Sequence, residues 1–376
     1  MSKNIVLCFD GTNNTVGNRQ TSILRIPGLI HPDDQVVYYD PGVGTLRRTT
    51  VFGRPKTTAS VLAGLGLGYG IFRNVAEAYR YLMNTYEDDD GIFLLGFSRG
   101  AYTARLLAGL IQFCGLLDRG RDNLIPHALD AYTRRVRKND GKEEPPFKTG
   151  GRIRSRFGRL PPIQYAGLFD TVSSLGLTLG REQNPHSDAN AVIRTVRHAL
   201  ALDERRSFYR PPLMHPPKIA AAGLPKPAAD SILQVWFAGV HSDIGGGYEA
   251  NDVSRMPLEW ILVGAARAGL RLKRNEALAA TNVSRPFTEN AFPIHDSMGR
   301  VWPLAEFVKR YTWNRDRNNW DRSANHGRPR RVPPETAIHQ SVLDRGADIA
   351  SYRPTNIPAS PIVAAWDRLA GEPNLL

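Results

Sequence analysis

The chain has 376 residues, which is enough for one large α/β domain with insertions or for two smaller domains, and either can bury a substantial core. Hydrophobic residues make up 41% and charged residues 23% of the sequence, so an intrinsically disordered chain is excluded. The formal net charge of +13 indicates an anionic membrane surface as a partner, unless the basic residues form only a solvated face. Nucleic acid is not expected, because the sequence has no zinc-finger spacing, RNP pattern or heptad-borne basic region.

The first residues, MSKNIVLCFDGT, contain an apolar stretch that Asp10 interrupts, and this stretch is too short and too polar for a signal peptide. No window approaches 18 uninterrupted apolar residues. We therefore expect a cytoplasmic protein, with export by a machine that needs no cleaved signal peptide as an open alternative. Cys8 and Cys114 lie in apolar runs and are expected to be core residues, not a disulfide.

Apolar, β-branched runs alternate with helical patterns along the chain and predict an α/β fold with a doubly wound, mostly parallel sheet. The predicted strands are residues 4–9, 35–39, 91–95, 163–169 and 232–240. The predicted helices include residues 71–86, 101–115 and 189–204, the last with Asp188 as its N-cap.

The stretches between the predicted elements are expected to be insertions on one sheet and not linkers between folded units. They lie near residues 43–70, 138–161 and 210–227. Residues 1–270 are therefore expected to form the core, and residues 271–376 a C-terminal cap packed on it. The glycine-rich segment from Val61 to Phe72 is expected either to open as an apolar flap or to pack as the start of a helix.

Residues 91–104, GIFLLGFSRGAYTA, place Ser98 between two glycines where an apolar strand passes into a helix. Gly96, Ser98 and Gly100 form G-x-S-x-G, the pattern of a nucleophile elbow. An elbow holds its serine in a strained backbone conformation, and larger side chains two residues to either side would collide as the helix packs back on the strand. In this context the pattern predicts a catalytic serine.

A serine becomes an effective nucleophile when a base takes its proton, and the base needs an acid to fix its tautomer. Asp170 and His241 each stand where an apolar strand runs into a polar loop. Since catalytic groups gather at the carboxyl ends of parallel strands, we expect both to converge with Ser98, in the chain order Ser, Asp, His. His339 is the second candidate for the base, and Asp243 is the second candidate for the acid.

Acyl transfer also needs backbone N–H groups that bind the negatively charged oxygen of the tetrahedral intermediate. Arg99, directly after the serine, is expected to supply one of them. The loop after the first strand, CFDGTNNT, offers Gly11 or Thr12 for the second, unless Asp10 uses this loop for a polar turn of its own. No metal and no cofactor are expected, because no cluster of His, Asp and Glu has metal-ligand spacing.

Seven segments, in order between residue 9 and about residue 345, share a pattern with a known family: FDGTNN, YYDPGVGT, GFSRGAYTAR, LFDTVSSLG, RHALALDERR, VWFAGVHSDIGGGY and IHQSVLDR. Together they resemble the DUF2235 family of α/β hydrolases, which includes the Tle1-type lipase effectors of bacterial type VI secretion. The resemblance implies an α/β-hydrolase fold with Ser98 as nucleophile, Asp170 as acid and His241 as base. It also implies a serine esterase of phospholipase A type that acts on phospholipid or other lipid esters, with an immunity protein as partner if the chain is an effector.

Other functions stay open beside this one. A phosphotransferase of haloacid dehalogenase type would need an aspartate in place of Cys8, and AGLGLGYGI offers no placement of the dinucleotide pattern G-x-G-x-x-G. A hydrolase of soluble or polysaccharide acyl esters is the second candidate, because a triad specifies acyl transfer and says little about the acyl group. A non-catalytic binding module on the same fold is the third, and it would have to keep Ser98, Asp170 and His241 in order by chance.

Overall fold

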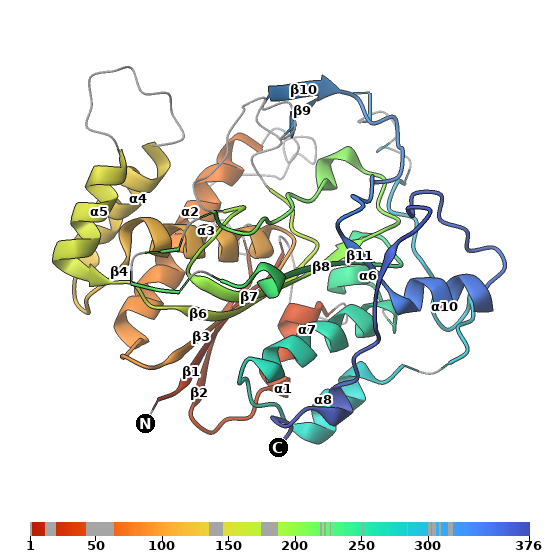
Figure 1. Cartoon of the computed structure of the whole chain (residues 1–376), viewed down its shortest axis with the longest axis horizontal. Helices are drawn as coiled ribbons and strands as arrows, with labels where there is room; N and C mark the ends of the chain where they lie inside the picture. The colour runs from red at the N-terminus through yellow and green to blue at the C-terminus, as the bar shows by residue number, and fades with distance from the viewer. Residues whose placement is uncertain are drawn as a thin grey trace, which may run out of the picture.

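The computed structural model describes residues 2–11, 20–42, 64–134, 146–173, 187–218, 220–221, 223–225, 227–249, 252–283, 285–299, 302, 306–307, 310–314 and 319–376. Eight strands form its central sheet: β1 (Asn4–Phe9), β2 (Gln35–Asp40), β3 (Gly91–Phe97), β6 (Ile163–Phe169), β7 (Ile193–Ala201), β8 (Ile232–Phe237), β11 (Ala337–His339) and β12 (Ile362–Ala364). Their order is β12-β11-β8-β7-β6-β3-β1-β2, and all neighbouring strands run parallel (Figure 1).

Helices cover both faces of the sheet. The helices of the described residues are α1 (Ser22–Leu29), α2 (Gly64–Thr85), α3 (Arg99–Cys114), α4 (Ile125–Arg134), α5 (Pro146–Phe157), α6 (His241–Gly245), α7 (Arg255–Arg267), α8 (Arg274–Thr281) and α10 (Gln340–Asp348). Buried side chains of α2, α3 and α4 form a core on one face, and those of α1, α7 and α8 form a core on the other (Figure 1). This arrangement confirms the predicted α/β fold with a doubly wound parallel sheet.

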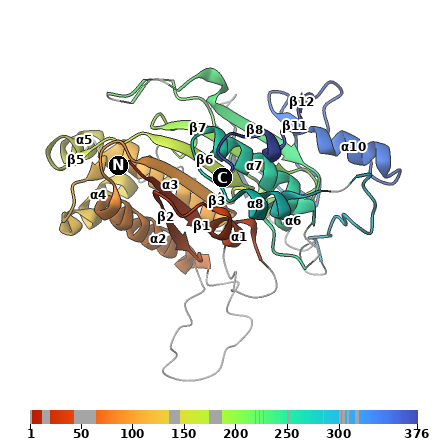
Figure 2. The ribbon, with the colours of Figure 1, turned by 90° about the horizontal axis from the view of Figure 1, so that it is seen from below.

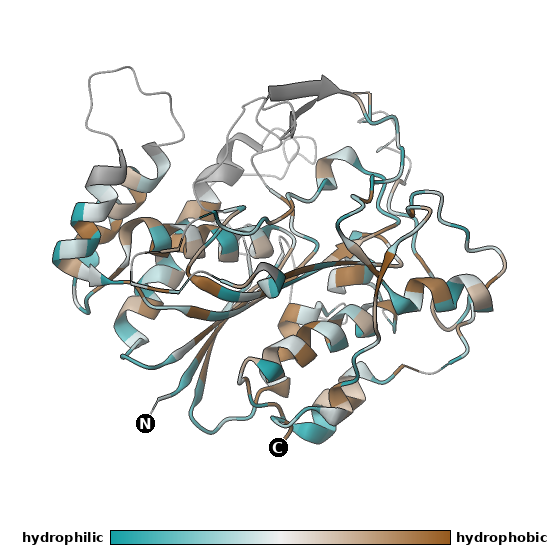
Figure 3. Cartoon of the chain, viewed as in Figure 1, coloured by the Kyte–Doolittle hydropathy of each residue, from teal (hydrophilic) through white to brown (hydrophobic). Residues whose placement is uncertain are grey.

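The central strands are buried on both sides. All seven residues of β3 are buried, and β1 and β6 are each buried at all but one position. Strands covered by helices on both faces read as nearly continuous apolar runs, which is why the sequence predicted them, and Figure 3 shows the hydrophobic colour along the sheet. Cys8 and Cys114 are buried and free, and burial raises the pKa of the Cys114 thiol to about 12.

The helix predicted for residues 189–204 is wrong, because this segment forms β7, between β6 and β8. Asp188 therefore stands before a bend and a strand, not at the start of a helix. Two of the side chains that looked like the polar face of a helix are buried and paired: Arg197 donates to a backbone carbonyl (2.5 Å), and the His198 ring contacts the Gln234 side chain (3.2 Å). Together with the exposed Arg194, these buried polar side chains produced an amphipathic pattern on a strand.

The C-terminal residues 271–376 do more than cover the core, because they contribute two strands to the sheet. β11 pairs with β8 and β12 pairs with β11, and Figure 2 shows these strands and α10 side by side beyond β8. Near the other edge, Leu272 forms bridges with Ile30 and Leu375, which fastens the end of the chain beside α1. The division of the chain near residue 270 stays a prediction.

The predicted insertions are described only in part, since residues 43–63 and 138–145 lie outside the described residues. From Gly64 on, the glycine-rich segment forms the first turns of α2, and residues 210–227 contain neither helix nor strand at their described positions. Two small antiparallel pairs join β4 (Leu116–Leu117) to β5 (Gly158–Arg159) and β9 (Arg310–Asn314) to β10 (Asn319–Ser323). Within the described segments, no helix has the length and apolar character needed to cross a membrane.

The strand order reverses at the edge of the sheet where catalytic residues were predicted. β2 lies on one side of β1, whereas β3 and all later strands lie on the other, so the chain reverses direction across the sheet between β1 and β3. In open parallel sheets, ligands bind beyond the carboxyl ends of the strands at such a reversal. Residues that directly follow β3, β6 and β8 therefore share one edge of the sheet.

Candidate active site

Ser98 lies on a strained turn between β3 and α3. It is the N-cap of α3 and has φ 58° and ψ −121°, a backbone conformation that residues other than glycine rarely adopt. The two flanking glycines are required by close packing: a Cβ on Gly96 would meet the backbone of Ala101 at 2.6 Å, and a Cβ on Gly100 would collide with the carbonyl oxygen of Phe9. The G-x-S-x-G segment therefore has the geometry of a nucleophile elbow.

The structure brings Ser98, Asp170 and His241 into one chain of hydrogen bonds. Asp170 directly follows β6, and His241 begins α6 after β8. With the imidazole neutral and its proton on Nδ1, Nδ1–H donates to Asp170 Oδ2 (2.6 Å) and Nε2 accepts from Ser98 Oγ (2.8 Å). All three side chains are buried, and the rings of Phe97 and Tyr209 each lie 4.7 Å from the imidazole, centroid to centroid.

The surroundings favour a charged Asp170 carboxylate and a neutral His241 imidazole. Burial alone would raise the pKa of Asp170, but the Arg330 guanidinium and the hydrogen bond from His241 hold it well below its usual range. Burial lowers the pKa of His241, and the hydrogen bond and charge of Asp170 oppose this effect only in part. At neutral pH the imidazole is therefore free to accept a proton from Ser98.

The predicted donors for an oxyanion are only partly described. Arg99 is the first residue of α3, so its backbone N–H has no partner within the helix and lies beside Ser98. The Gly11 N–H donates to Asp10 Oδ1 (2.6 Å), and Asp10 Oδ2 accepts from Thr21 Oγ1 (2.6 Å) and the Tyr39 hydroxyl (2.9 Å). Asp10 thus organises its own loop, as the alternative interpretation expected, and Gly11 would have to exchange this bond to serve as a donor. Thr12 lies outside the described residues.

The second candidates for base and acid have other partners. His339 ends β11 with its ring stacked on Phe237 (4.5 Å between centroids), and its Nδ1 contacts Ser341 Oγ (2.7 Å). Burial lowers the pKa of His339 to about 3. Asp243 accepts hydrogen bonds from His295 Nδ1 (2.6 Å) and from the backbone N–H of Val240 (2.9 Å).

Arg330 is a site residue that the sequence analysis missed. Its Nη1 donates to Asp170 Oδ1 (2.6 Å) and its Nη2 to Asp170 Oδ2 (3.0 Å), so the guanidinium binds both oxygens of the acid. It comes from the basic segment GRPRR, 160 residues after Asp170. An isolated arginine in such a segment reads as part of a solvated face, and no local pattern distinguishes it.

Glu204 and Arg206 form a second ion pair beside His241, and these residues were also missed. The Glu204 carboxylate accepts the His241 backbone N–H (3.2 Å) and two bonds from Arg206 (2.9 and 2.8 Å). Although burial alone would raise the pKa of Glu204, Arg206 lowers it to about 2. Arg206 lies over the Tyr209 ring (3.7 Å to the centroid), whose edge contacts His241. The sequence signal that could have identified Glu204 and Arg206 is LDERR, which belongs to one of the segments that carry the family resemblance.

The described residues contain no ready-made metal site. Among the described residues, no group of three or more His, Cys, Asp or Glu side chains is arranged to hold a metal ion. The groups closest to Ser98 are the His241 imidazole and two carboxylates, Asp170 and Glu204, each of which is bound by an arginine.

Comparisons with known proteins place the chain in a family. The model of the family described as "T6SS, Phospholipase effector Tle1-like, catalytic domain" matches residues 3–263. Uncharacterized protein YEL023C of Saccharomyces cerevisiae is 34% identical over 219 residues, which are 55% of this chain and 32% of that protein.

Two solved structures are also similar. An uncharacterized protein from Pseudomonas aeruginosa aligns with a TM-score of 0.40 and 19% identity, over 78% of this chain and 49% of that chain. The Tle1 effector bound to the VgrG spike from the Type 6 secretion system aligns with a TM-score of 0.35 and 20% identity, over 66% of this chain and 51% of that chain. The chain thus spans about a third of the curated relative and about half of each solved chain.

The match to the family model confirms the resemblance that the sequence segments predicted. It covers well over half of the chain and includes Ser98, Asp170 and His241. The chain belongs to the family of Tle1-like phospholipase effector catalytic domains of the type VI secretion system.

Proposed function

We propose that this chain hydrolyses carboxylic esters of lipids, with Ser98 as nucleophile, His241 as general base and Asp170 as the acid that orients it. The observation that carries the proposal is the chain of hydrogen bonds from Ser98 Oγ through His241 to Asp170, with Ser98 on a strained elbow. Membership in a phospholipase effector family supports a lipid ester as the substrate.

The geometry suits a two-step acyl transfer. His241 Nε2 takes the proton of Ser98 Oγ as the oxygen attacks the ester carbonyl, and the Arg99 N–H stabilises the resulting oxyanion. Collapse of this intermediate breaks the bond to the alcohol, which leaves with the proton from Nε2, and the acyl group stays on Ser98. Water, deprotonated by His241, then attacks the acyl-enzyme and releases the fatty acid, while Ser98 regains its proton.

Asp170→Asn is expected to lower kcat by about 10⁴-fold while the fold is retained. The carbonyl of the new amide side chain would accept from Arg330, so its NH₂ group would face His241 and force the imidazole proton onto Nε2, where it cannot accept from Ser98. Single-turnover kinetics together with a thermal unfolding curve would measure both effects. A rate within tenfold of wild type would contradict a role of Asp170 in orienting the base.

Arg99 supports a substrate that carries a negative charge. Its side chain is half-buried next to Ser98, and burial lowers its pKa to about 10. In the part of the chain that the structure describes, its guanidinium has no carboxylate partner. A partly desolvated guanidinium is stabilised when an anion pairs with it, and the phosphodiester of a phospholipid is such a group.

Arg99→Gln is expected to lower kcat/KM on phosphatidylglycerol by about 10- to 100-fold, because a charge-assisted hydrogen bond to the phosphate is lost. Activity on a neutral ester such as p-nitrophenyl butyrate should stay within about threefold of wild type, since the backbone N–H of residue 99 is kept. Parallel assays of the two substrates give the ratio. Equal losses on both substrates would remove Arg99 as a phosphate-binding residue.

The proposed function is tested by assaying the purified chain on defined phospholipids, neutral glycerides, soluble esters and acylated polysaccharides. Hydrolysis of phospholipid supports the proposal, hydrolysis of only soluble or polysaccharide esters supports the second candidate, and no hydrolysis favours a binding module.

An anionic membrane is a further proposed partner, supported by the net charge of +13 and by exposed Arg152 and Arg156 on α5. Sedimentation with phosphatidylglycerol vesicles, but not phosphatidylcholine vesicles, at low salt would test it.

The solved Tle1 effector is bound to a VgrG spike, and we propose a corresponding spike protein as a partner of this chain. Synthesis in the cytoplasm, export without a cleaved signal peptide and neutralisation by an immunity protein belong to the same proposal. Co-purification of the chain with a spike protein from the same genome would test the first of these partners.

A further inference from the structure

The base of the proposed triad stands between two carboxylate–guanidinium pairs. On one side, His241 Nδ1 contacts Asp170, and Arg330 binds both oxygens of that carboxylate. On the other side, Glu204 accepts the backbone N–H of His241 and is bound by Arg206. The charges of these four side chains therefore sum to zero, whereas Asp170 alone would place one net negative charge beside the imidazole.

Arg330 is held in place by several contacts that do not involve His241. Its Nη1 also donates to the carbonyl oxygen of Ala201 (3.0 Å), and its Nη2 to that of Tyr209. The backbone N–H of Ala201 donates to Asp170 Oδ1 (3.0 Å). The guanidinium thus joins the acid, the end of β7 and the residue whose ring packs on the base.

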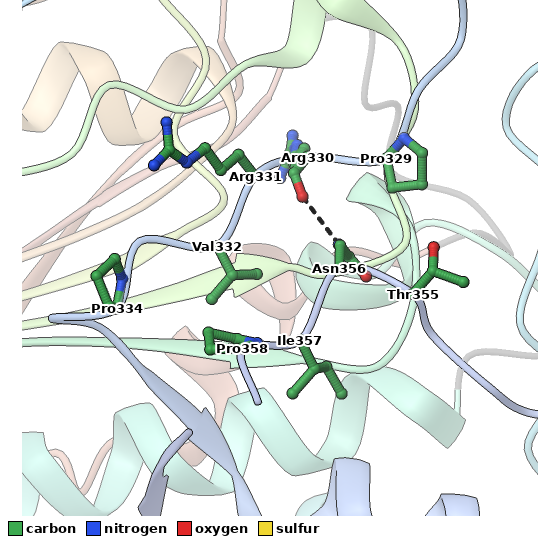
Figure 4. A pocket seen from close by; sticks show the side chains of 9 residues that line it. All are labelled: Pro329, Arg330, Arg331, Val332, Pro334, Thr355, Asn356, Ile357 and Pro358. Carbon is green, nitrogen blue, oxygen red and sulfur yellow. Dashed lines mark hydrogen bonds between the residues drawn. The ribbon is translucent and has the colours of Figure 1, made fainter. Parts of the chain in front are cut away.

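The backbone of Arg330 is fastened to the same strand end. Asn356 Nδ2 donates to the carbonyl oxygens of Arg330 (2.9 Å) and Leu202 (2.9 Å), and Figure 4 shows the bond between Asn356 and Arg330 in the wall of a cavity of about 370 Å³. The neighbouring Arg331 lines this cavity too, but its side chain is exposed whereas Arg330 is buried. These contacts hold the Arg330 guanidinium in a fixed position against Asp170.

We propose that Arg330 is a positioning residue that clamps both oxygens of Asp170 and offsets its charge, so that His241 stays neutral and able to accept a proton in more acidic solution. This inference rests on the proposed function. A carboxylate favours the imidazolium, and a guanidinium on the same carboxylate opposes it. The cation lies close enough to matter, because the path from Nη2 through Oδ2 to Nδ1 consists of one 3.0 Å and one 2.6 Å contact.

Arg330→Met is expected to shift the acid limb of the kcat/KM profile upward by about one pH unit or more. The sign follows from the charges: without Arg330, Asp170 and the Glu204–Arg206 pair leave a net negative charge at the imidazole, so protonation of His241 becomes easier. The assay uses a neutral, water-soluble ester and measures the released acid by chromatography, so neither membrane binding nor the pH dependence of a dye affects it. The plateau rate should fall about tenfold or more, because Asp170 is no longer clamped.

Two variants separate charge from geometry. Arg330→Lys keeps the positive charge and loses the two-pronged contact, so its acid limb should stay near wild type while its plateau rate falls. Arg331→Met, the matched control in the same segment, should change neither. If Arg330→Met has a lower plateau rate but an unmoved acid limb, Arg330 does not offset the charge of Asp170. Arg330 would then have only a structural role, and the proposal would be overturned.

The test remains decisive if Arg330→Met fails to fold, which circular dichroism would reveal. In that case Arg330→Ala is assayed with methylguanidinium added, and recovery of rate together with a return of the acid limb to lower pH supports the proposal. An acid limb of Arg330→Ala that stays at the wild-type pH, or an acid limb of Arg330→Lys that moves to higher pH although the positive charge is kept, overturns it. The rate of inactivation by a fluorophosphonate, measured against pH, gives a second profile for the Arg330 variant. If its acid limb does not move and the Ser98→Ala enzyme is inactive, only the role of Arg330 is rejected. If the Ser98→Ala enzyme is active, the proposed function itself is rejected.

Discussion

The Ser98→Ala variant is expected to lose ester hydrolysis by about five to six orders of magnitude and to lose all labelling by a fluorophosphonate probe. Fluorophosphonates react with serines whose proton is taken by a neighbouring base, and His241 Nε2 lies 2.8 Å from Ser98 Oγ. Mass spectrometry of the labelled wild-type protein should place the adduct on the peptide that contains Ser98. Retention of more than about a tenth of the wild-type rate would move the nucleophile elsewhere.

Ser98→Gly is the matched control for the fold. Because residue 98 has φ 58°, alanine keeps the backbone strain of serine, whereas glycine relieves it. The glycine variant should therefore be as inactive as the alanine variant and unfold at a temperature no lower than it. Inactivity with an intact unfolding transition separates the loss of the nucleophile from the loss of structure.

Local patterns made part of this site predictable. Ser98, Asp170 and His241 each follow an apolar strand, and the rule that parallel strands end at the same edge brings residues together that are 71 to 143 positions apart in the chain. The strands themselves were visible because helices bury them on both faces, which leaves nearly continuous apolar runs. The catalytic roles of the three residues stay predictions that the experiments above test.

Elements that depend on distant partners were not predictable. β7 resembles an amphipathic helix because Arg197 and His198 are polar, yet both are buried and bonded to residues of other elements. β11 and β12 have three residues each, too few to show a period of two. Their place in the sheet is decided by pairing with β8, a contact that the sequence near them does not reveal.

The charged residues around His241 illustrate the same limit. Arginines are abundant in this basic chain, and a basic segment usually forms a solvated face. What distinguishes Arg330 is its contact with Asp170, and what distinguishes Arg206 is its contact with Glu204 under the base. Burial and pairing, not residue type, single them out, and both arise only after the chain has folded.

The His241→Ala variant is expected to lose nearly as much activity as Ser98→Ala, because the serine then lacks the group that takes its proton. His339→Ala is the comparison variant, since His339 is also a buried histidine at the end of a strand. Its ring packs on Phe237 and its Nδ1 contacts Ser341, so its loss should lower the unfolding temperature and leave kcat of the folded enzyme within about threefold of wild type.

The pH dependence sharpens this comparison. Burial lowers the pKa of His241, so the wild-type rate should fall only when acid protonates the imidazole below its usual range, and His339→Ala should keep this acid limb. The residual rate of His241→Ala should show no such limb, because the titrating base is gone. Measurement of kcat/KM against pH for all three proteins, with the concentration of folded enzyme determined for each, decides the assignment. An active His241→Ala enzyme beside an inactive, well-folded His339→Ala enzyme would transfer the role of the base to His339.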